Sequence, residues 1–139
     1  MTRITQTADL QACHALRRAV FMEEQGISEA DEFDDLDQGA LHFLAVQDGH
    51  AVGTARLLIS GDTARVGRIC VLKDQRGTGL GAQLIGAALE VARAQPGVQQ
   101  ARLGAQVSAI AFYEKLGFVT CGPVYDDAGI PHREMSCAL

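Results

Sequence analysis

The stretch DQRGTGLGAQLIGAAL, residues 74–89, places three glycines at alternate positions directly before a segment with the apolar spacing of a helix. That helix must end before Pro96, because the residue before a proline is driven out of the helical conformation. Backbone N–H groups at a helix N-terminus have no partner within the helix, and glycine lets an anion approach them closely. The stretch therefore predicts either a strand-to-helix turn without a ligand or a turn that binds phosphate.

Two common phosphate motifs fit this stretch poorly. A Walker A loop ends in Gly-Lys-Ser or Gly-Lys-Thr, whereas Gly81 is followed by Ala-Gln. The dinucleotide fingerprint G-x-G-x-x-A matches residues 77–82, but it also requires an acidic residue about 20 positions further on. No Asp or Glu occurs in residues 91–113, so a nucleotide-dependent oxidoreductase would lack its ribose-binding residue. A third motif, Arg-x-x-Gly-x-Gly, is satisfied by residues 76–81.

The bulk composition indicates a single soluble domain of 139 residues. The net charge of −5 argues against a general nucleic-acid binder. No apolar run approaches the roughly 18 to 20 residues of a membrane span, and the N-terminus shows no secretory signal. We therefore expect a cytoplasmic protein with no membrane partner. The four cysteines include no CxxC pair and no zinc spacing, so we expect neither a disulfide framework nor a metal site.

Charge is distributed unevenly along the chain. Nine acidic residues and no Lys or Arg lie between Ala19 and Ala55, whereas basic residues prevail from Ala55 to Arg76. One interpretation is a solvated acidic loop over residues 28–39. The other is an acidic rim that attracts a cationic substrate, opposite a basic region suited to an anionic cofactor. The sequence leaves both open.

Apolar periodicity and turn residues predict ten elements. The expected strands are 2–7, 41–47, 51–59, 64–72, 100–107, 118–125 and 131–139, and the expected helices run from Thr7 or Asp9 to about Glu24, from residue 80 to before Pro96, and from Ser108 to Gly117. Turns at residues 48–49 and 61–62 join three strands into an antiparallel meander, and residues 127–129 close a final hairpin. The order β-α-β-β-β-α-β-α-β-β predicts one α+β domain, 1–139, with a mixed, mostly antiparallel central sheet of six to seven strands flanked by helices.

Two motifs together identify a family that this chain resembles. VLKDQRGTGLGAQLIGAAL (71–89) follows a predicted strand, and AIAFYEKLGFV (109–119) comes about thirty residues later. The pair, in this order and at this separation, resembles the GNAT superfamily of acetyl-CoA-dependent N-acetyltransferases, and the resemblance in element order spans nearly the whole chain. AVFMEEQGI (19–27) and AGIPHREM (128–135) are similar to small bacterial members of the ElaA type.

The resemblance implies a coenzyme A site. In the family the strand RICVL (68–72) splays from the strand RLGAQV (102–107), and the pantetheine arm lies between them. The backbone N–H of Val71 would polarise the thioester carbonyl, and Gln106 stands where many members have an Asn that supports the arm. The implied cofactor-binding residues are Ile69, Cys70 and Val71 along the arm, Arg76, Gly77, Thr78, Gly79, Leu80 and Gly81 at the pyrophosphate, and Gln106 and Tyr113.

The catalytic residues are less clearly marked. By resemblance, Tyr113 protonates the departing coenzyme A thiolate, although a residue at its position would also pack against Phe118. The general base that deprotonates the amine is left open among Glu23, Glu24 and His132, each of which has an ordinary structural alternative. We expect Glu24 and His132 to line the substrate cleft.

These expectations combine into one function and one alternative. The chain is expected to transfer an acetyl group from acetyl-CoA to a primary amine of a small molecule or peptide, by direct attack in a ternary complex. Cys70 would offer a covalent route, but a strand cysteine is more often a buried apolar side chain. The alternative is a non-catalytic acyl-CoA-binding sensor or interaction module of the same fold, which has no need of a proton donor at Tyr113. Members of the resembling family often form dimers, so a homodimer is one alternative, and the sequence leaves the oligomeric state open.

Overall fold

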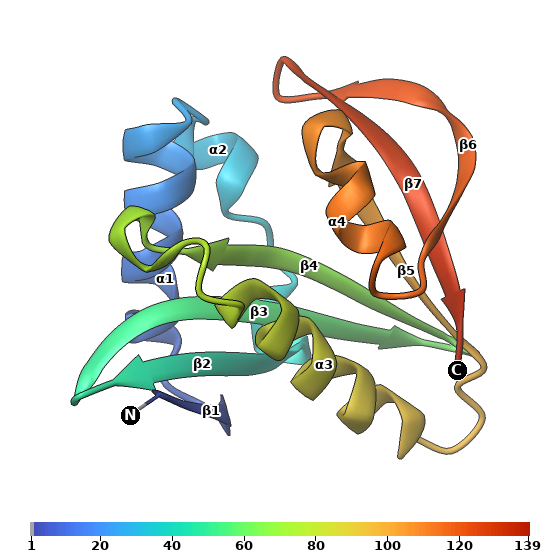
Figure 1. Cartoon of the computed structure of the whole chain (residues 1–139), viewed down its shortest axis with the longest axis horizontal. Helices are drawn as coiled ribbons and strands as arrows, with labels where there is room; N and C mark the ends of the chain where they lie inside the picture. Colours follow the sequence, from blue (N-terminus) through green and yellow to red (C-terminus); the bar gives the residue numbers. More distant parts are fainter. Residues whose placement is uncertain (1) are drawn as a thin grey trace.

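The fold is built on one mixed sheet of seven strands, in the order β1-β2-β3-β4-β5-β7-β6 (Figure 1). The computed structural model describes residues 2–139. The strands are β1 (Thr2–Thr7), β2 (Leu41–Gln47), β3 (His50–Ser60), β4 (Thr63–Val71), β5 (Gln100–Gln106), β6 (Val119–Asp127) and β7 (Ile130–Ala138). The helices are α1 (Leu10–Arg17), continued by a π-helical segment (Arg18–Glu24), α2 (Glu29–Glu32), α3 (Leu80–Arg93) and α4 (Ile110–Glu114), with 3-10 turns at Asp37–Gly39, Lys73–Gln75 and Val107–Ala109. The predicted α+β class and element order are confirmed, with α2 as an additional turn of helix.

Left-handed turn residues set the register of two hairpins. Asp48 and Gly49, between β2 and β3, have φ angles of 51° and 83°. Ala128 and Gly129, between β6 and β7, have φ angles of 53° and 81°. Two successive left-handed residues form the tight turn whose twist matches that of antiparallel strands. Both hairpins occur where the sequence predicts them.

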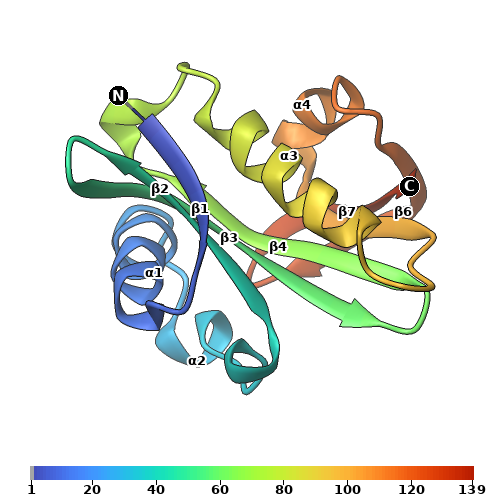
Figure 2. The same ribbon diagram turned by 90° about the horizontal axis from the view of Figure 1, so that it is seen from below.

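Helices cover both faces of the sheet, but unequally (Figure 2). On one face, α3 and α4 pack over the larger apolar core, which includes Leu84, Leu103 and Met135. On the other face, α1 packs mainly on β2, β3 and β4, over a smaller cluster with Leu16 and Cys70. The second face of β5, β7 and β6 therefore lies beyond the cover of α1. None of the described helices is both long enough and apolar enough to cross a membrane.

The starts of two helices show where local sequence decides the structure and where it does not. The Asp9 carboxylate accepts a backbone N–H at 3.1 Å and caps α1, as predicted. Ser108 does not cap the short helix as predicted, because α4 begins at Ile110 and its N-cap, Ala109, makes no side-chain hydrogen bond. The 3-10 turn Val107–Ala109 takes the place of the first helical turn and moves the helix start beyond Ser108.

The acidic segment 28–39 is only partly a solvated loop: most of its residues are exposed, but two of its carboxylates belong to a buried ion cluster. Its carboxylates Glu32 and Asp37 are only 3% and 7% exposed. Arg17 of α1, itself 1% exposed, donates to Glu32 at 2.7 Å and to Asp37 at 2.9 Å. Arg56 of β3 donates to Asp37 at 3.0 Å and to Asp34 at 2.8 and 3.1 Å. The interpretation as an acidic rim is therefore wrong for these three carboxylates, since arginines within the protein neutralise them.

The carboxylates of this cluster differ in how firmly they hold their charge. Burial is the largest effect on Glu32 and raises its pKa, in spite of the hydrogen bond from Arg17. Burial also opposes ionisation of Asp37, but hydrogen bonds from Arg17, Arg56 and His14 outweigh it and hold the pKa of Asp37 well below its usual range. The Asp37 carboxylate therefore stays ionised to a lower pH than the Glu32 carboxylate, whose charge depends on its arginine partners.

A further arginine, Arg68, ties the buried ion cluster to an irregularity in β4. The pairing of β4 with β3 slips by one residue between Gly67 and Cys70, so β4 bulges there. Arg68 lies in this bulge, with a left-handed φ of 49°. Its guanidinium is 3.2 Å from the Glu32 carboxylate and 3.3 Å from that of Asp34. Carboxylates from the α2 region thus anchor β4 at the point where it bends.

β4 and β5 are parallel neighbours over only part of their length. They pair at three positions, from Thr63 with Gln100 to Arg65 with Arg102, and are unpaired beyond them. Figure 1 shows the resulting V, which opens between α1 and the β6–β7 hairpin. The strands thus splay as the family resemblance implies, and the end of β4 is left without a neighbour on that side.

Replacing Arg17 by methionine tests the buried ion cluster. Arg17→Met leaves Glu32 and Asp37 buried without their shared partner, and we expect it to lower the free energy of unfolding by about 3–5 kcal/mol. Arg18→Met is the matched control, because Arg18 forms an exposed ion pair with Glu29 at 2.8 Å. It should lower that free energy by about 1 kcal/mol at most. Urea denaturation followed by circular dichroism measures both, and equal effects would contradict a structural role of the cluster.

Candidate active site

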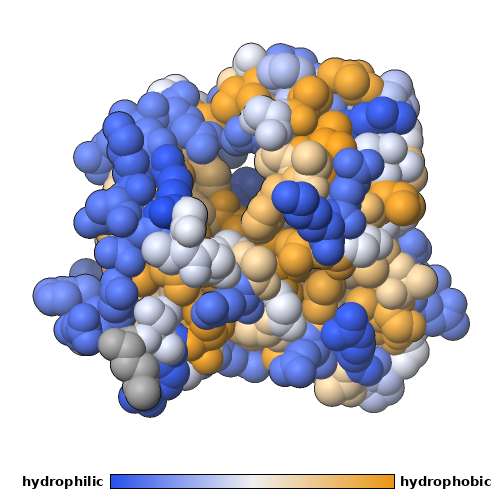
Figure 3. Space-filling view, viewed as in Figure 1, coloured by the Kyte–Doolittle hydropathy of each residue, from blue (hydrophilic) through white to orange (hydrophobic). Residues whose placement is uncertain are grey.

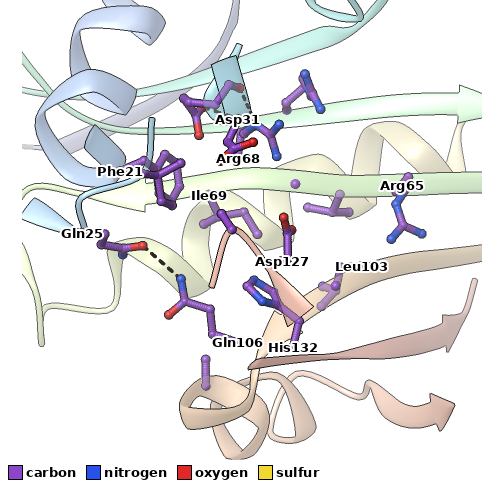
Figure 4. Close-up of a pocket in the computed structure, with 18 of the residues that line it drawn as sticks. Phe21, Gln25, Asp31, Arg65, Arg68, Ile69, Leu103, Gln106, Asp127 and His132 are labelled. Atoms are coloured by element: carbon purple, nitrogen blue, oxygen red, sulfur yellow. Dashed lines mark hydrogen bonds and ion pairs between the residues drawn. The ribbon is translucent and has the colours of Figure 1, made fainter. Parts of the chain in front are cut away.

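A cavity of about 440 Å³ lies in the V between β4 and β5 (Figure 4). Its walls come from β4 and β5, from the region between α1 and α2, from α4, and from the β6–β7 hairpin. The space-filling view shows the molecule hollowed between these parts, with hydrophilic side chains gathered on the α1–α2 side (Figure 3). The walls include four of the residues singled out from the sequence, Ile69, Gln106, Tyr113 and His132.

The glycine-rich turn lies where β4 leads into α3. Gly77 and Gly79 have φ angles of 79° and 85°, which residues with a Cβ rarely adopt. Gly79 is the N-cap of α3, and no side chain caps this helix. The first hydrogen bond of α3 runs from the N–H of Gln83 to Gly79 at 3.1 Å, so the N–H groups of residues 80–82 have no partner in the helix. This arrangement suits an anion.

The other residues of the glycine-rich turn differ in their contacts and burial. The Thr78 hydroxyl donates to a backbone carbonyl at 2.6 Å and tightens the turn, whereas Leu80 is a core residue with 4% exposure. Gly81 has no left-handed φ, and a Cβ there would meet only the ring of Phe112 in α4, at 3.4 Å. The start of α3 therefore lies beside α4, whose Tyr113 belongs to the cavity wall.

Successive side chains of β4 point to opposite faces of the sheet. Ile69 lines the cavity, whereas Cys70 is buried in the cluster beneath α1. Burial raises the pKa of the Cys70 thiol to about 12, so this thiol is a poor nucleophile. The geometry gives a covalent route through Cys70 no support.

The backbone N–H of Val71 points towards the open side of the V. In an antiparallel pair, successive residues direct their N–H groups to opposite sides of the strand. The N–H of Leu72 donates to Val52 of β3 at 2.9 Å, so the N–H of Val71 points away from β3. On that side β5 pairs only with residues 63–65. This donor is therefore directed at the space between the two strands.

Tyr113 packs in the fold and also faces the cavity. Its ring meets the rings of Phe118 at 6.1 Å and Phe112 at 5.1 Å, both edge-on, so the packing on Phe118 that the sequence allows is present. The same side chain lines the cavity. Burial raises the pKa of Tyr113 to about 12, which keeps the phenol protonated at neutral pH. Tyr113 thus holds a protonated phenol in the cavity wall.

His132 lines the cavity with its tautomer fixed. Its Nδ1 lies 2.8 Å from the carbonyl oxygen of Ile130, and because a carbonyl only accepts hydrogen bonds, Nδ1 carries the proton. In the neutral ring, Nε2 then holds the lone pair. The ring of Tyr125 stacks on this imidazole with 5.8 Å between centroids. His132 therefore has the geometry of an oriented base.

Glu24 and Arg76 pair with each other outside the cavity. Arg76 donates to the two oxygens of Glu24 at 2.6 and 2.7 Å, and to the Val71 carbonyl at 3.0 Å. The hydrogen bond from Arg76 lowers the pKa of Glu24, which makes this carboxylate a weaker base. Neither Glu24 nor the exposed Glu23 lines the cavity. Of the two residues expected in the cleft, His132 lies in the cavity wall, whereas Glu24 lies outside that wall, paired with the Arg76 that also donates to the Val71 carbonyl. A catalytic role for Glu24 stays a prediction.

Two residues that the sequence analysis missed complete the site. Gln25 accepts a hydrogen bond from Nε2 of Gln106 at 3.1 Å, which bridges the two sides of the V (Figure 4). Tyr125 pairs with His132, and His132 with Gln106, so these three side chains form a row on one face of β6, β7 and β5. The two-residue turn at 128–129 implies the pairing of Tyr125 with His132. No local signal marks Gln25, whose partner is 81 residues away.

Comparison with known proteins gives the family. Residues 7–139 match the family described as acetyltransferase (GNAT) domain. The chain is 42% identical over 137 residues to protein YyaT of Bacillus subtilis, covering 96% of this chain and 92% of that protein. It is 35% identical over 133 residues to ElaA of Escherichia coli, covering 93% and 87%. The crystal structure of an acyl-CoA N-acyltransferase from Pseudomonas aeruginosa matches with a TM-score of 0.86 at 32% identity and 99% coverage of both chains. The chain therefore belongs to the GNAT family of acetyltransferase enzymes, in the branch of small bacterial members similar to ElaA.

Proposed function

We propose that the protein transfers an acetyl group from acetyl-CoA to a primary amine of a small molecule or peptide, by direct attack of the amine in a ternary complex. GNAT acyl-CoA N-acyltransferases act on amines with acyl-CoA donors. The observation that carries the narrower proposal is the V between β4 and β5. The Val71 N–H points into the gap between these strands, and Tyr113 and His132 line the cavity in the same V, although Val71 itself is not among the lining residues. Cytoplasmic location and homodimer formation stay predictions.

The residues present fit coenzyme A. Uncapped N–H groups at the start of α3 suit a pyrophosphate, and the open edge of β4 offers hydrogen bonds to an extended arm, as it would to an added strand. When bound, acetyl-CoA supplies an acetyl group activated as a thioester. The proposed contacts are Ile69, Cys70 and Val71 through the backbone of β4, Arg76, Gly77, Thr78, Gly79, Leu80 and Gly81 at the pyrophosphate, and Gln106 and Tyr113 on the far side of the arm.

Two groups of the chain assist the attack. The Val71 N–H stabilises the negative charge that develops on the carbonyl oxygen, and one donor of this kind is typically worth about 3 kcal/mol of the barrier. Nε2 of His132 accepts the proton of the attacking amine, a contribution of about 10²- to 10⁴-fold in rate. We assign this role to His132 and not to Glu24, because the pKa of Glu24 is lowered and both its oxygens accept hydrogen bonds from Arg76.

Tyr113 supplies the proton that the departing thiolate needs. An exposed thiol has a pKa of about 8.5, well below the value of about 12 that burial gives Tyr113. Partial burial in the cavity makes a thiolate a stronger base than it is in water, which lowers the free-energy cost of proton transfer from Tyr113 compared with transfer to an exposed thiolate.

Gly81→Val tests the pyrophosphate site, with Gly86→Val as its matched control. Both glycines lie in α3 without a left-handed φ, and a Cβ at Gly86 would meet nothing within 4 Å. We expect Gly81→Val to weaken coenzyme A binding at least about ten-fold, because valine would cover the N–H groups at the helix start. Isothermal titration calorimetry measures the affinities. If both variants fold and bind coenzyme A equally well, the start of α3 is not part of the site.

Gly79→Val is less informative than Gly81→Val. At Gly79 the φ of 85° strains any side chain, whether or not a ligand binds. Loss of binding in that variant would therefore not separate a cofactor role from a turn role.

Tyr113→Phe and His132→Gln test the two proton transfers. Each should lower kcat about 10²-fold or more and leave the affinity for coenzyme A nearly unchanged. Thiol release from acetyl-CoA with a panel of amines measures turnover. Phe112→Leu is the control, because Phe112 neighbours Tyr113 and has no proton to give. Unchanged turnover of either variant would remove that residue from the mechanism.

Coenzyme A binding without thiol release by the unmodified protein would favour the alternative function, a non-catalytic acyl-CoA-binding module.

A further inference from the structure

The arginines that line the cavity are all neutralised within the protein. Arg56 and Arg68 belong to the buried ion cluster, where carboxylates hold both guanidinium groups. Arg65 donates to the two oxygens of Glu134 at 2.7 and 3.0 Å. Each arginine of the described cavity wall is therefore ion-paired with at least one carboxylate, and the one guanidinium nitrogen that is buried without a hydrogen-bond partner is Nε of Arg56.

Two carboxylates of the same walls have no such partner. Asp31 lies on the α2 side and Asp127 on the β6–β7 hairpin, and neither carboxylate makes a hydrogen bond or ion pair with another residue in the range 2–139. Figure 4 shows Asp127 in the cavity near His132, with Asp31 and Arg68 on the opposite wall. The uncompensated charge of the cavity wall is therefore negative on both sides.

The ring of Tyr125 forms an aromatic wall next to Asp127. The two residues are two positions apart on β6, so their side chains lie on the same face. The ring stacks on His132 at an interplanar angle of 29° and lies over Gly104 of β5, where a Cβ would overlap the Tyr125 hydroxyl. Aromatic faces attract cations, and a neighbouring carboxylate adds to that attraction. This wall thus has the chemistry of an ammonium site beside the proposed base.

We propose that the acceptor is an amine that carries a second positive group, and that Asp127 and Tyr125 bind this group while His132 receives the proton of the reacting amine. The inference rests on the proposed acetyl transfer and narrows its substrate class. Asp31 adds negative potential from the opposite wall. Acceptors with a carboxylate are disfavoured, because the nearby arginines are already paired.

Three amines of similar length with different far ends test this proposal: 1,4-diaminobutane, n-butylamine and 4-aminobutyrate. With acetyl-CoA as donor, we expect kcat/KM for 1,4-diaminobutane to exceed that for n-butylamine about five-fold, and 4-aminobutyrate to be the poorest acceptor. Asp127→Asn should bring the first two amines within about two-fold of each other. Asp127→Lys should favour 4-aminobutyrate over the diamine.

Glu90→Gln is the matched control for Asp127→Asn. It also removes one exposed carboxylate, but from α3 and outside the cavity, and it should keep the order of the three amines. A rate independent of the far-end charge, or a preference unchanged by Asp127→Asn, would overturn the proposal and leave acetyl transfer intact. Thiol release with none of the three, nor with a wider panel of amines, would contradict acetyl transfer itself and this inference with it.

Discussion

The divergence of β4 from β5 is the constraint on which the site depends. β4 pairs with β3 on both sides of the bulge, but it pairs with β5 at only three positions. The edge that this leaves open carries the Val71 N–H, and Tyr113 of α4 and His132 of β7 line the cavity in the same V. A β5 that paired with β4 along its whole length would fill the cavity and occupy the Val71 N–H, so the candidate site depends on the separation of these two strands.

The buried ion cluster holds one arm of the V. Arg17 joins α1 to the acidic segment, and Arg68 joins that segment to the bulge in β4. Buried ion pairs contribute little net stability compared with apolar packing. Each guanidinium, however, donates good hydrogen bonds to a carboxylate only in a narrow set of orientations. The left-handed φ of Arg68 is strained for a residue with a side chain and persists only where its surroundings hold it. The cluster thus fixes the backbone conformation of β4 at the point where this strand bends.

Local chemistry explains which parts of the fold could be predicted from the sequence. Asp48-Gly49 and the Asp9 cap act within a few residues, and their structures follow from turn and capping preferences. The resemblance of residues 71–89 and 109–119 to the GNAT superfamily likewise identified the glycine turn and Tyr113 as candidate site residues. The partners of Arg17 lie 15 and 20 residues away and that of Arg76 lies 52 residues away. Pairings at such distances depend on how whole elements pack, so the sequence analysis left the acidic segment open and placed Glu24 in the cleft.

The crystal structure of the protein in complex with coenzyme A tests the central claim most directly. The account predicts the pyrophosphate on the N–H groups at the start of α3 and the pantetheine arm in the V, hydrogen-bonded to the open edge of β4 near Val71. The sulfur should then lie within reach of the Tyr113 hydroxyl. Coenzyme A bound elsewhere on the surface, or a β5 that closes against β4 in the complex, would contradict it.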